Sequence, residues 1–408
     1  MVDLPEDVCL ARQAIFDTDM QVCGYELLYR PTLGAIDPRA APTAAEETTM
    51  TAATVTAALT DIGLNVIVGD NPAWVNVGAD FLKGDLGAVL PPDRTVIEVL
   101  ETVPGDDALF DAIDQLKGDK YLVALDDFVW RPESERLLEL ADIVKLDVLH
   151  HGADLATIVD QLKRHEVDLV AEKVETYEML DRCRDLGFTR FQGNFLEKPR
   201  MFSTVRVSAE AAVRLQLVAR MNDPDIGFSE LSELIATDVT LSYRLLRYIN
   251  SAYIGLRKPV SSVREALIAL GSRRVRSWAT LLFLADAGAG RQELVVTALV
   301  RARMCQTLAD TLGVDTERAF MAGLLSVVDA LIDRPLEDAL GELPLDGELT
   351  SALLVRDGAL GDLLQRVVSF EHGDFGRATA PPVGAAAATR AYIESLDWAN
   401  QLMGGIVD

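Results

Sequence analysis

Short apolar segments alternate with amphipathic segments through the first half of the chain. The apolar segments have the length and the Val, Ile and aromatic content of β-strands, and the segments between them have the spacing of helices. Strand-like segments occupy residues 12–17, 73–78, 95–101, 121–127, 142–148, 168–174 and 190–196. Apolar runs separated by helices are typical of parallel strands that helices cover. Seven or more such units within about 200 residues predict a (β/α) TIM-like barrel rather than an open sheet.

Helical segments fill most of the gaps between these strands. Two of them lie at residues 44–63 and 176–187. The second ends at Gly187, the residue type that most often closes a helix.

The pattern changes from Ala209 onward, where helical periodicity dominates and strand signals disappear. In residues 261–272, Ser262 and Glu265 form a capping box and Gly271 ends the helix. Residues 241–253 form another amphipathic helix, and residues 378–390 are predicted to be a loop before a last helix. The fold class is therefore α/β plus all-α. We place the barrel at residues 1–203 and the helical bundle at residues 204–408.

The composition of the chain limits which ligands and partners it can bind. The chain has 408 residues, of which 49% are hydrophobic and 25% charged, as in a folded globular protein. Its net charge of −26 would repel DNA and anionic membranes, so a phosphate ligand would need a local cluster of cations or a bound metal. The alternative interpretation is that the negative charge only keeps the protein soluble. The four cysteines form no CxxC pair, which argues against a disulfide framework or a zinc site. We find no signal peptide and no membrane-length apolar run, and we expect a cytoplasmic location.

Polar side chains recur at or near the C-terminal ends of the predicted strands. The carboxyl ends of barrel strands meet at one mouth, so these side chains should converge there. Asp126 and Asp127 alone would suggest a solvated turn, and Lys145 alone a surface lysine. Burying many carboxylates without cations costs several kcal/mol per charge, and oxygen ligands suit Mg²⁺ or Mn²⁺. The set is Glu26, Asn76, Glu98, Asp126, Asp127, Lys145, Asp147, Glu172, Glu175 and Gln192.

These residues also carry a resemblance to the EAL domain family of bacterial cyclic di-GMP phosphodiesterases. "YELLYR" resembles the E-x-L-x-R signature of that family, and "WVNVG" its V-N-x-S strand, with Gly78 where the serine is usual. "IEVLE", "LDDF", "VKLDV", "AEKVE" and "FQGNFLEKP" follow in the order and spacing of its later motifs. The match extends along the whole first domain.

The resemblance implies a role for each residue. The implied metal ligands are Glu26, Asn76, Glu98, Asp126, Asp127 and Glu172. Lys145, Glu172 and Gln192 would form the catalytic set, with Lys145 orienting or activating water and Gln192 joining the metal–water network. Arg30 and Glu26 would contact the ligand, Arg30 through a phosphate.

The segment after Asp127 departs from the family. The family has a Gly- and Ser-rich loop there, whereas this chain has "FVWRPES", which is bulkier and stiffened by Pro132. Glu101 and Glu175 match the residues that tether the family's loop, but their partners in the loop are gone. Lys173 replaces a glycine beside Glu172 and could pair with a carboxylate.

Three interpretations follow for the barrel. It binds cyclic di-GMP as a sensor with weak or no hydrolysis, it is an active phosphodiesterase that produces pGpG, or it is a protein scaffold with an empty mouth. A metal-dependent barrel lyase or phosphatase is a further alternative, because acidic strand ends serve many chemistries. A homodimer is conceivable, although EAL domains often pair through the altered region.

The second half resembles the HDOD family, degenerate relatives of HD phosphohydrolases. "TDVTLSYRLLRYINSAY", "SSVREALIALG" and "AFMAGLLSVVDAL" carry this resemblance. An HD metal site needs paired His and Asp ligands, but Asp329 has no histidine beside it and His372 is the one histidine of this half. We therefore expect a non-catalytic domain that binds an unknown protein partner. A cluster of basic residues is either solvated or a docking patch: Arg257, Lys258, Arg264, Arg273, Arg274 and Arg276.

Overall fold

A computed structural model of the chain describes residues 8–31, 63–78, 90–100, 106–130, 134–197, 226–236, 260–272, 292–332, 334–341 and 345–407, with a few isolated positions between them. The chain divides into two compact units. One comprises Met1–Leu196 with Phe370–Arg377, and the other comprises Glu197–Ser369 with Ala378–Asp408. The division expected after residue 203 falls outside the described residues and stays a prediction.

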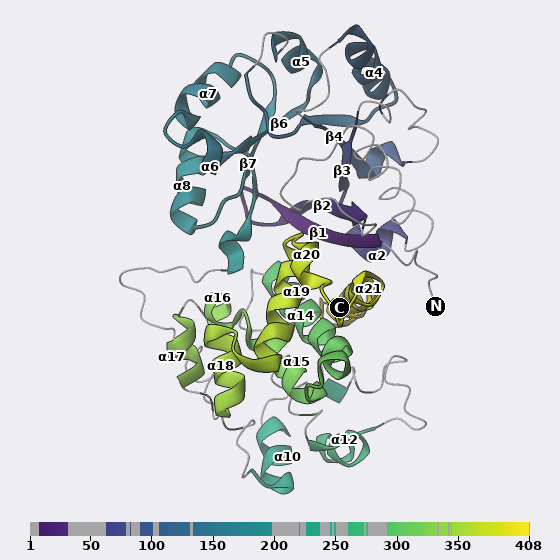
Figure 1. Ribbon diagram of the computed structural model, residues 1–408, viewed down its shortest axis with the longest axis vertical. Helices are drawn as coiled ribbons and strands as arrows, with labels where there is room; N and C mark the ends of the chain where they lie inside the picture. Colours follow the sequence, from purple (N-terminus) through teal and green to yellow (C-terminus); the bar gives the residue numbers. More distant parts are fainter. Residues whose placement is uncertain are drawn as a thin grey trace. The chain divides into compact units, whose positions relative to one another are not determined.

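The first unit contains a closed barrel of eight strands in chain order, as the sequence predicted (Figure 1). The strands are β1 Val8–Asp17, β2 Val22–Pro31, β3 Ala73–Val77, β4 Thr95–Val99, β5 Leu122–Leu125, β6 Ile143–Asp147, β7 Asp168–Glu172 and β8 Arg190–Gln192.

The expectation that all strands run parallel is wrong for β1. This strand is antiparallel to both β2 and β8, whereas the other neighbouring pairs are parallel. A short turn joins β1 to β2, and the Asp17 carboxylate accepts hydrogen bonds from the backbone N–H groups of Asp19 and Gln21 within it. A turn of this length connects only antiparallel strands.

Helices surround the outside of the strands (Figure 1). Those of the first unit are α2 Leu64–Val68, α4 Asp107–Gly118, α5 Ser134–Leu140, α6 Val148–His151, α7 Leu155–Leu162 and α8 Tyr177–Leu186, with 3₁₀ turns η3 Pro92–Arg94 and η4 Asn194–Glu197. The helix predicted at 176–187 is confirmed. Thr176 Oγ1 accepts from the Met179 N–H at its start, and Gly187 at its end has a left-handed φ of 104°. The helix predicted at 44–63 lies almost wholly outside the described residues.

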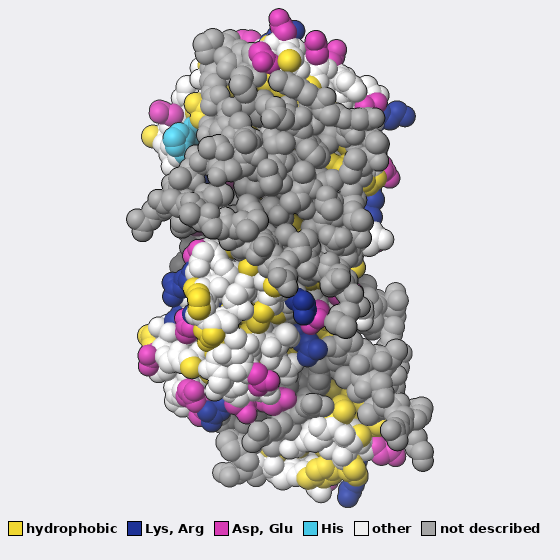
Figure 2. All heavy atoms as spheres, turned by 45° about the vertical axis from the view of Figure 1, so that its right-hand side comes forward, with side chains coloured by type: hydrophobic (Ala, Val, Ile, Leu, Met, Phe, Trp, Pro, Cys, Tyr) yellow, Lys and Arg dark blue, Asp and Glu magenta, His cyan; other side chains and the backbone are white. Residues whose placement is uncertain are grey.

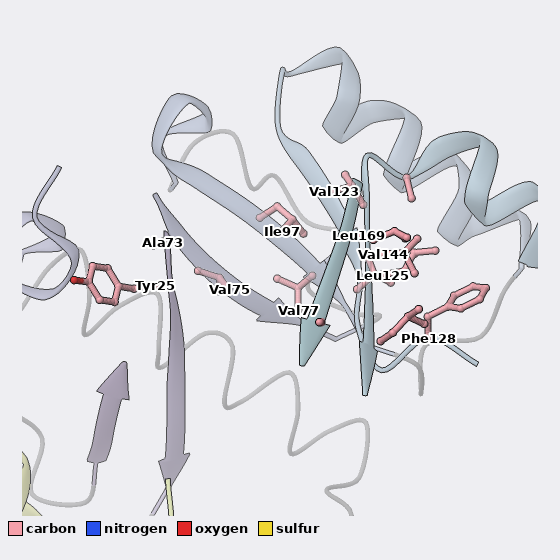
Figure 3. Close-up of a cluster of buried hydrophobic side chains, with 14 of the residues drawn as sticks. Tyr25, Ala73, Val75, Val77, Ile97, Val123, Leu125, Phe128, Val144 and Leu169 are labelled. Atoms are coloured by element: carbon pink, nitrogen blue, oxygen red, sulfur yellow. The ribbon is translucent and has the colours of Figure 1, made fainter. Parts of the chain in front are cut away.

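The barrel has two apolar layers. The outer layer lies between strands and helices and includes Val75, Val77 and Ile97 on neighbouring strands (Figure 3). A smaller separate cluster comprises Ile15, Trp74, Val96, Ala124, Ile143 and Val170. Strand side chains alternate in direction, so these positions share the opposite, inner side of the barrel. Gly24 leaves room for the indole of Trp74, since a Cβ at Gly24 would lie 2.2 Å from Trp74 Nε1.

The position of the inner layer fixes the position of the polar residues. In each of five strands, the residue two positions further along is polar and lies on the same inner side, one layer nearer the C-terminal strand end. These residues are Asn76, Glu98, Asp126, Lys145 and Glu172. The apolar inner cluster therefore forms the floor of a polar mouth.

The described part of the second unit is helical, as predicted. Its helices are α10 Phe228–Ala236, α12 Val263–Leu270, α14 Gln292–Leu308, α15 Thr316–Leu325, α16 Val328–Ile332, α17 Leu336–Gly341, α18 Gly347–Val355, α19 Gly358–Glu371 and α21 Ala385–Val407, with the 3₁₀ turn η5 Ala309–Leu312. The end of α19 and most of α20 Phe375–Ala378 belong to the segment Phe370–Arg377 of the first unit. Helix α12 has the predicted cap, in which Ser262 Oγ accepts from the Glu265 N–H. Helices α14 and α15 can pack closely because Gly323 has no Cβ; a Cβ there would lie 2.4 Å from the Arg301 carbonyl oxygen.

The predicted loop at 378–390 is shorter than expected. Helix α20 extends to Ala378, and α21 already begins at Ala385. The run of alanines after Gly384 has high helix propensity, which the turn residues before it obscured in the sequence. The helix expected at 241–253 has only isolated described positions.

Surface charge is dispersed in the view of Figure 2. Described Asp and Glu side chains lie in small groups with Lys and Arg side chains among them, rather than in one continuous acidic face. Such a pattern favours solvation of the negative charge. In the part of the chain that the structure describes, no helix combines the length and apolar character needed to span a bilayer.

Candidate functional site

The polar residues at the strand ends gather around one buried lysine. Lys145, on β6, has no exposed side-chain surface. Carboxylate oxygens from four other strands or strand ends lie close to its Nζ: Glu98 Oε1 at 2.6 Å, Glu172 Oε1 at 2.8 Å, Asp126 Oδ1 at 2.9 Å and Glu26 Oε2 at 3.1 Å. We call these four acids and Lys145 the inner rim. The sequence placed them at one mouth but did not identify the lysine as their common partner.

Glu26 is the most strongly hydrogen-bonded acid of the inner rim. Its Oε1 accepts from Asn76 Nδ2 at 2.8 Å, and its Oε2 accepts from Gln192 Nε2 at 2.7 Å and from Lys145 Nζ at 3.1 Å. Gln192 Nε2 also donates to Gln13 Oε1 at 2.9 Å. Gln13 was not predicted; its signal was a polar residue on the inner side of β1, directly opposite Glu26.

The pKa values of the four acids of the inner rim are shifted in different directions. Burial alone would raise the pKa of Glu26, but Lys145, Gln192 and Asn76 outweigh it and hold that pKa below its usual value. Burial and the Glu26 charge raise the pKa of Glu98 well above normal, and burial with the neighbouring acids raises the pKa of Glu172 to about 8. Burial also raises the pKa of Asp126 despite Lys145. One ammonium group therefore does not neutralise the cluster.

The lysine itself stays charged. Burial would lower its pKa, but the four surrounding carboxylates raise it well above the ordinary value. An ammonium group has three N–H donors, which is fewer than the four carboxylates that face it. Both Glu98 oxygens and Asp126 Oδ1 are buried, and the ion pairs of Glu98 Oε1 and Asp126 Oδ1 with Lys145 Nζ lack hydrogen-bond geometry.

These oxygens fit a hard divalent cation in their chemistry. Carboxylate and amide oxygens are the ligands of Mg²⁺, Mn²⁺ and Ca²⁺, and a cation would supply the missing positive charge. In their present arrangement the acids point at Lys145, and among the described residues no three acidic, His or Cys side chains surround a common metal position. Binding a cation therefore requires some of these side chains to turn from the lysine.

A second ion-pair group lies beside the inner rim. Lys173 Nζ donates to Asp147 Oδ2 at 2.5 Å and lies 3.9 Å from Asp127 Oδ1. Asp147 also caps α6 by accepting from the backbone N–H groups of Leu149 and His150. We call Lys173, Asp127 and Asp147 the outer group. Lys173 was expected to pair with a carboxylate, and its closest one is Asp147.

The segment after Asp127 has its own anchors. Phe128 is buried, its N–H donates to the Lys145 carbonyl at 3.1 Å, and His151 Nε2 lies 3.1 Å from its carbonyl oxygen. The ring of Trp130 packs edge-on against Phe128, with the ring centres 5.9 Å apart. Phe128 and His151 were missed, because a lone aromatic and a helical histidine carry no specific signal in sequence.

Of the three remaining predicted residues, the structure describes the side chain of one. Glu175 is exposed, Glu101 lies outside the described residues, and the Arg30 side chain is likewise outside them although its backbone pairs with Cys9 in the sheet. Their roles stay predictions.

In the helical unit, Asp329 lies on α16 and is partly buried, and burial raises its pKa. His372 is exposed in the turn after α19, within the segment Phe370–Arg377 that belongs to the first unit. Most of the basic cluster lies outside the described residues; Arg264 is described, with its guanidinium 6.0 Å from the Phe228 ring centre.

Comparisons with known proteins cover both units. Residues 209–380 match the HDOD domain family. The chain is 33% identical over 375 residues to the cyclic di-GMP phosphodiesterase CdgJ of Vibrio cholerae, covering 90% of this chain and 85% of that protein. It is 29% identical over 409 residues to the uncharacterized protein YuxH of Bacillus subtilis, covering 97% of this chain and 99% of YuxH.

Solved structures resemble part of the chain. PaMucR phosphodiesterase in complex with c-di-GMP shares 22% identity with a TM-score of 0.39, covering 46% of this chain and 94% of that chain. The manganese/cy-diGMP complex of Klebsiella pneumoniae BlrP1 shares 22% identity with a TM-score of 0.37, covering 47% of this chain and 56% of that chain.

Proposed function

This chain belongs to the protein family that includes the cyclic di-GMP phosphodiesterase CdgJ, and on that basis we propose that it is a bacterial cyclic di-GMP signalling protein. The barrel mouth binds the dinucleotide with a divalent cation, and the HDOD domain relays the bound state to a protein partner. The observation that carries the proposal is the inner rim, where acids from four parts of the barrel converge on one buried ammonium group.

The residues of the inner rim take separate roles. Glu26, Glu98, Asp126 and Glu172, with Asn76, hold the cation, which would be Mg²⁺ or Mn²⁺. When bound, the cation would supply charge neutralisation for the phosphodiester and a more acidic water. Gln192 keeps the Glu26 carboxylate oriented through its 2.7 Å hydrogen bond. Arg30 contacts a ligand phosphate at the rim.

Two features favour binding over rapid turnover. The acids are drawn toward Lys145 rather than toward a common metal position, and Asp127 faces Lys173 in the outer group. A displacement of about 1 Å in a catalytic arrangement costs about 100-fold in rate. We therefore infer weak hydrolysis at most.

An efficient phosphodiesterase that releases linear pGpG is the second candidate. The observation that favours it is the relative CdgJ, which is named for that activity and aligns with 90% of this chain.

Calorimetric titration with cyclic di-GMP in the presence of Ca²⁺ tests the proposal. Wild-type protein should bind at micromolar Kd, and Glu26→Ala should abolish the heat. Glu166→Ala is the matched control, because Glu166 is exposed just before β7, at the opposite end of the strand from the rim. Flat heats for wild-type protein would exclude cyclic di-GMP binding and leave a scaffold.

A parallel assay with Mn²⁺ and chromatographic detection of pGpG separates the two candidates. Slow or undetectable turnover supports the sensor. Rapid turnover that Glu26→Ala abolishes would establish the efficient enzyme instead.

A further inference from the structure

Lys173 occupies a backbone conformation that favours glycine. Its φ is +55°, in the left-handed region that residues with a Cβ rarely adopt. Asp127, across the outer group, is also left-handed, with a φ of +43°. Strained residues of this kind persist where the surrounding structure holds them, and they cluster at functional sites. The backbone conformation of Lys173 therefore points to a functional role for its ammonium group at the rim.

The contacts of Lys173 fix where its charge lies. Its Nζ is bound to Asp147 Oδ2 at 2.5 Å, and the same Asp147 carboxylate accepts from the N–H groups of Leu149 and His150 at 2.8 and 2.9 Å. Asp147 is thus held by α6 and anchors the lysine. The ammonium group remains within 3.9 Å of Asp127, while about half of the Lys173 side chain stays exposed.

Among the described residues of the barrel mouth, two ammonium groups each face their own carboxylates. Lys145 faces the four acids of the inner rim, and Lys173 faces Asp127 and Asp147. The inner acids outnumber their ammonium four to one. The outer group has two carboxylates for one ammonium group, so its negative charge is more nearly neutralised.

We propose that Lys173 is a built-in counter-ion for Asp127 and Asp147, so that the outer group does not take up a second divalent cation. This inference rests on the proposed cation-binding inner rim. A unit charge about 4 Å from a doubly charged ion weakens its binding about 30-fold even at the dielectric constant of water. The mouth then binds one cation at the inner rim.

Calorimetric titration with Mn²⁺ tests this with three proteins. Wild-type protein should bind one Mn²⁺ per chain. Lys173→Gly, which also relieves the left-handed strain, should bind a second Mn²⁺ at Asp127 and Asp147, with an affinity about 30-fold above the residual affinity of these acids in wild-type protein. Lys173→Arg keeps the charge and should behave like wild type. Electron paramagnetic resonance should show a coupled pair of Mn²⁺ ions in Lys173→Gly alone.

The outcomes separate this inference from the proposed function. Equal Mn²⁺ stoichiometry in wild type and Lys173→Gly, whether one or two, would overturn the counter-ion role and leave the inner cation site standing. No Mn²⁺ binding by any of the three proteins would overturn the cation site, and the inference with it.

Discussion

Replacing Lys145 with methionine removes the buried ammonium group but keeps an unbranched apolar side chain. Lys145 has no exposed side-chain surface, and carboxylate oxygens of four acids lie 2.6–3.1 Å from its Nζ. Its loss leaves buried carboxylates without their cation. Removing one partner of a buried ion pair costs about 3–5 kcal/mol, so we expect the barrel of Lys145→Met to lose that much stability in the absence of divalent cations.

The loss should depend on pH and on divalent cations. Below the raised pKa values of Glu98, Asp126 and Glu172 these acids take up protons, so the variant should lose less stability there than above about pH 8. Ca²⁺ should restore part of the lost stability, because it supplies positive charge to the same oxygens.

Urea unfolding followed by circular dichroism and tryptophan fluorescence measures the effect. The two units can unfold separately, so the barrel transition has to be fitted on its own. Lys163→Met is the control. Lys163 follows α7 and pairs with Asp160 at 2.9 Å, both side chains are exposed, and the loss of this pair should cost less than about 1 kcal/mol. Equal effects of the two substitutions would refute the assignment of Lys145 as the central counter-ion.

Substitutions of Glu98 and Gly193 and the titration of Glu172 test other parts of the barrel. Glu98→Gln should destabilise the cation-free barrel less than Lys145→Met does, because burial and the Glu26 charge raise the pKa of Glu98 and so disfavour its charged form. The same substitution should reduce stabilisation by Ca²⁺. Thermal unfolding with and without Ca²⁺ checks both, and a cation-free loss as large as that of Lys145→Met would contradict it. Glu172 has a pKa of about 8 in the folded protein against an ordinary 4.5, so its contribution to stability is present below pH 4.5 and is lost as the pH rises through 8. Stabilisation of the barrel by Ca²⁺ should grow as the pH rises from 4.5 to 8, because the Glu172 carboxylate loses its proton over this range. Thermal unfolding that shows a pH-independent Ca²⁺ effect would argue against this titration. Gly193→Ala should destabilise the barrel by about 1–3 kcal/mol in chemical denaturation, because a Cβ there would lie 2.1 Å from the Val174 carbonyl oxygen. Gly118→Ala is the control, because a Cβ at Gly118 meets no atom within 4 Å and its φ is not left-handed; an equal loss for both would contradict the prediction.

The barrel and its polar mouth could be predicted because both depend on local patterns. The alternation that places Trp74, Val96 and Ile143 inside the barrel also directs Asn76, Glu98 and Lys145 inward two residues later. Strand ends and helix caps such as Thr176 and Gly187 are likewise readable from neighbouring residues. These features need no knowledge of distant contacts.

The pairing within the mouth could not be predicted. Lys145 contacts acids from separate parts of the chain, and Glu26 lies 119 residues from it in sequence, so only closure of the barrel brings them together. The acidic strand ends predicted that divalent cations balance their charge, whereas in the structure the buried Lys145 supplies one of the positive charges. The antiparallel direction of β1 was also missed, because the turn between β1 and β2 has no Asn-Gly or similar hairpin signal.

The replaced segment after Asp127 shows the same limit. "FVWRPES" indicated that the loop partners of Glu101 and Glu175 were lost, which is a local observation. That Phe128 is buried and that His151 lies within hydrogen-bond distance of its carbonyl oxygen depends on the neighbouring α6. A substitute for a lost contact can therefore be seen only in three dimensions.

Anomalous X-ray diffraction from crystals grown with Mn²⁺ and cyclic di-GMP would test the central claim most directly. We expect an Mn²⁺ peak coordinated by oxygens of Glu26, Glu98, Asp126 and Glu172, with the dinucleotide phosphate beside it. A map with no Mn²⁺ peak at the inner rim, and with Lys145 still bound to all four acids, would contradict it.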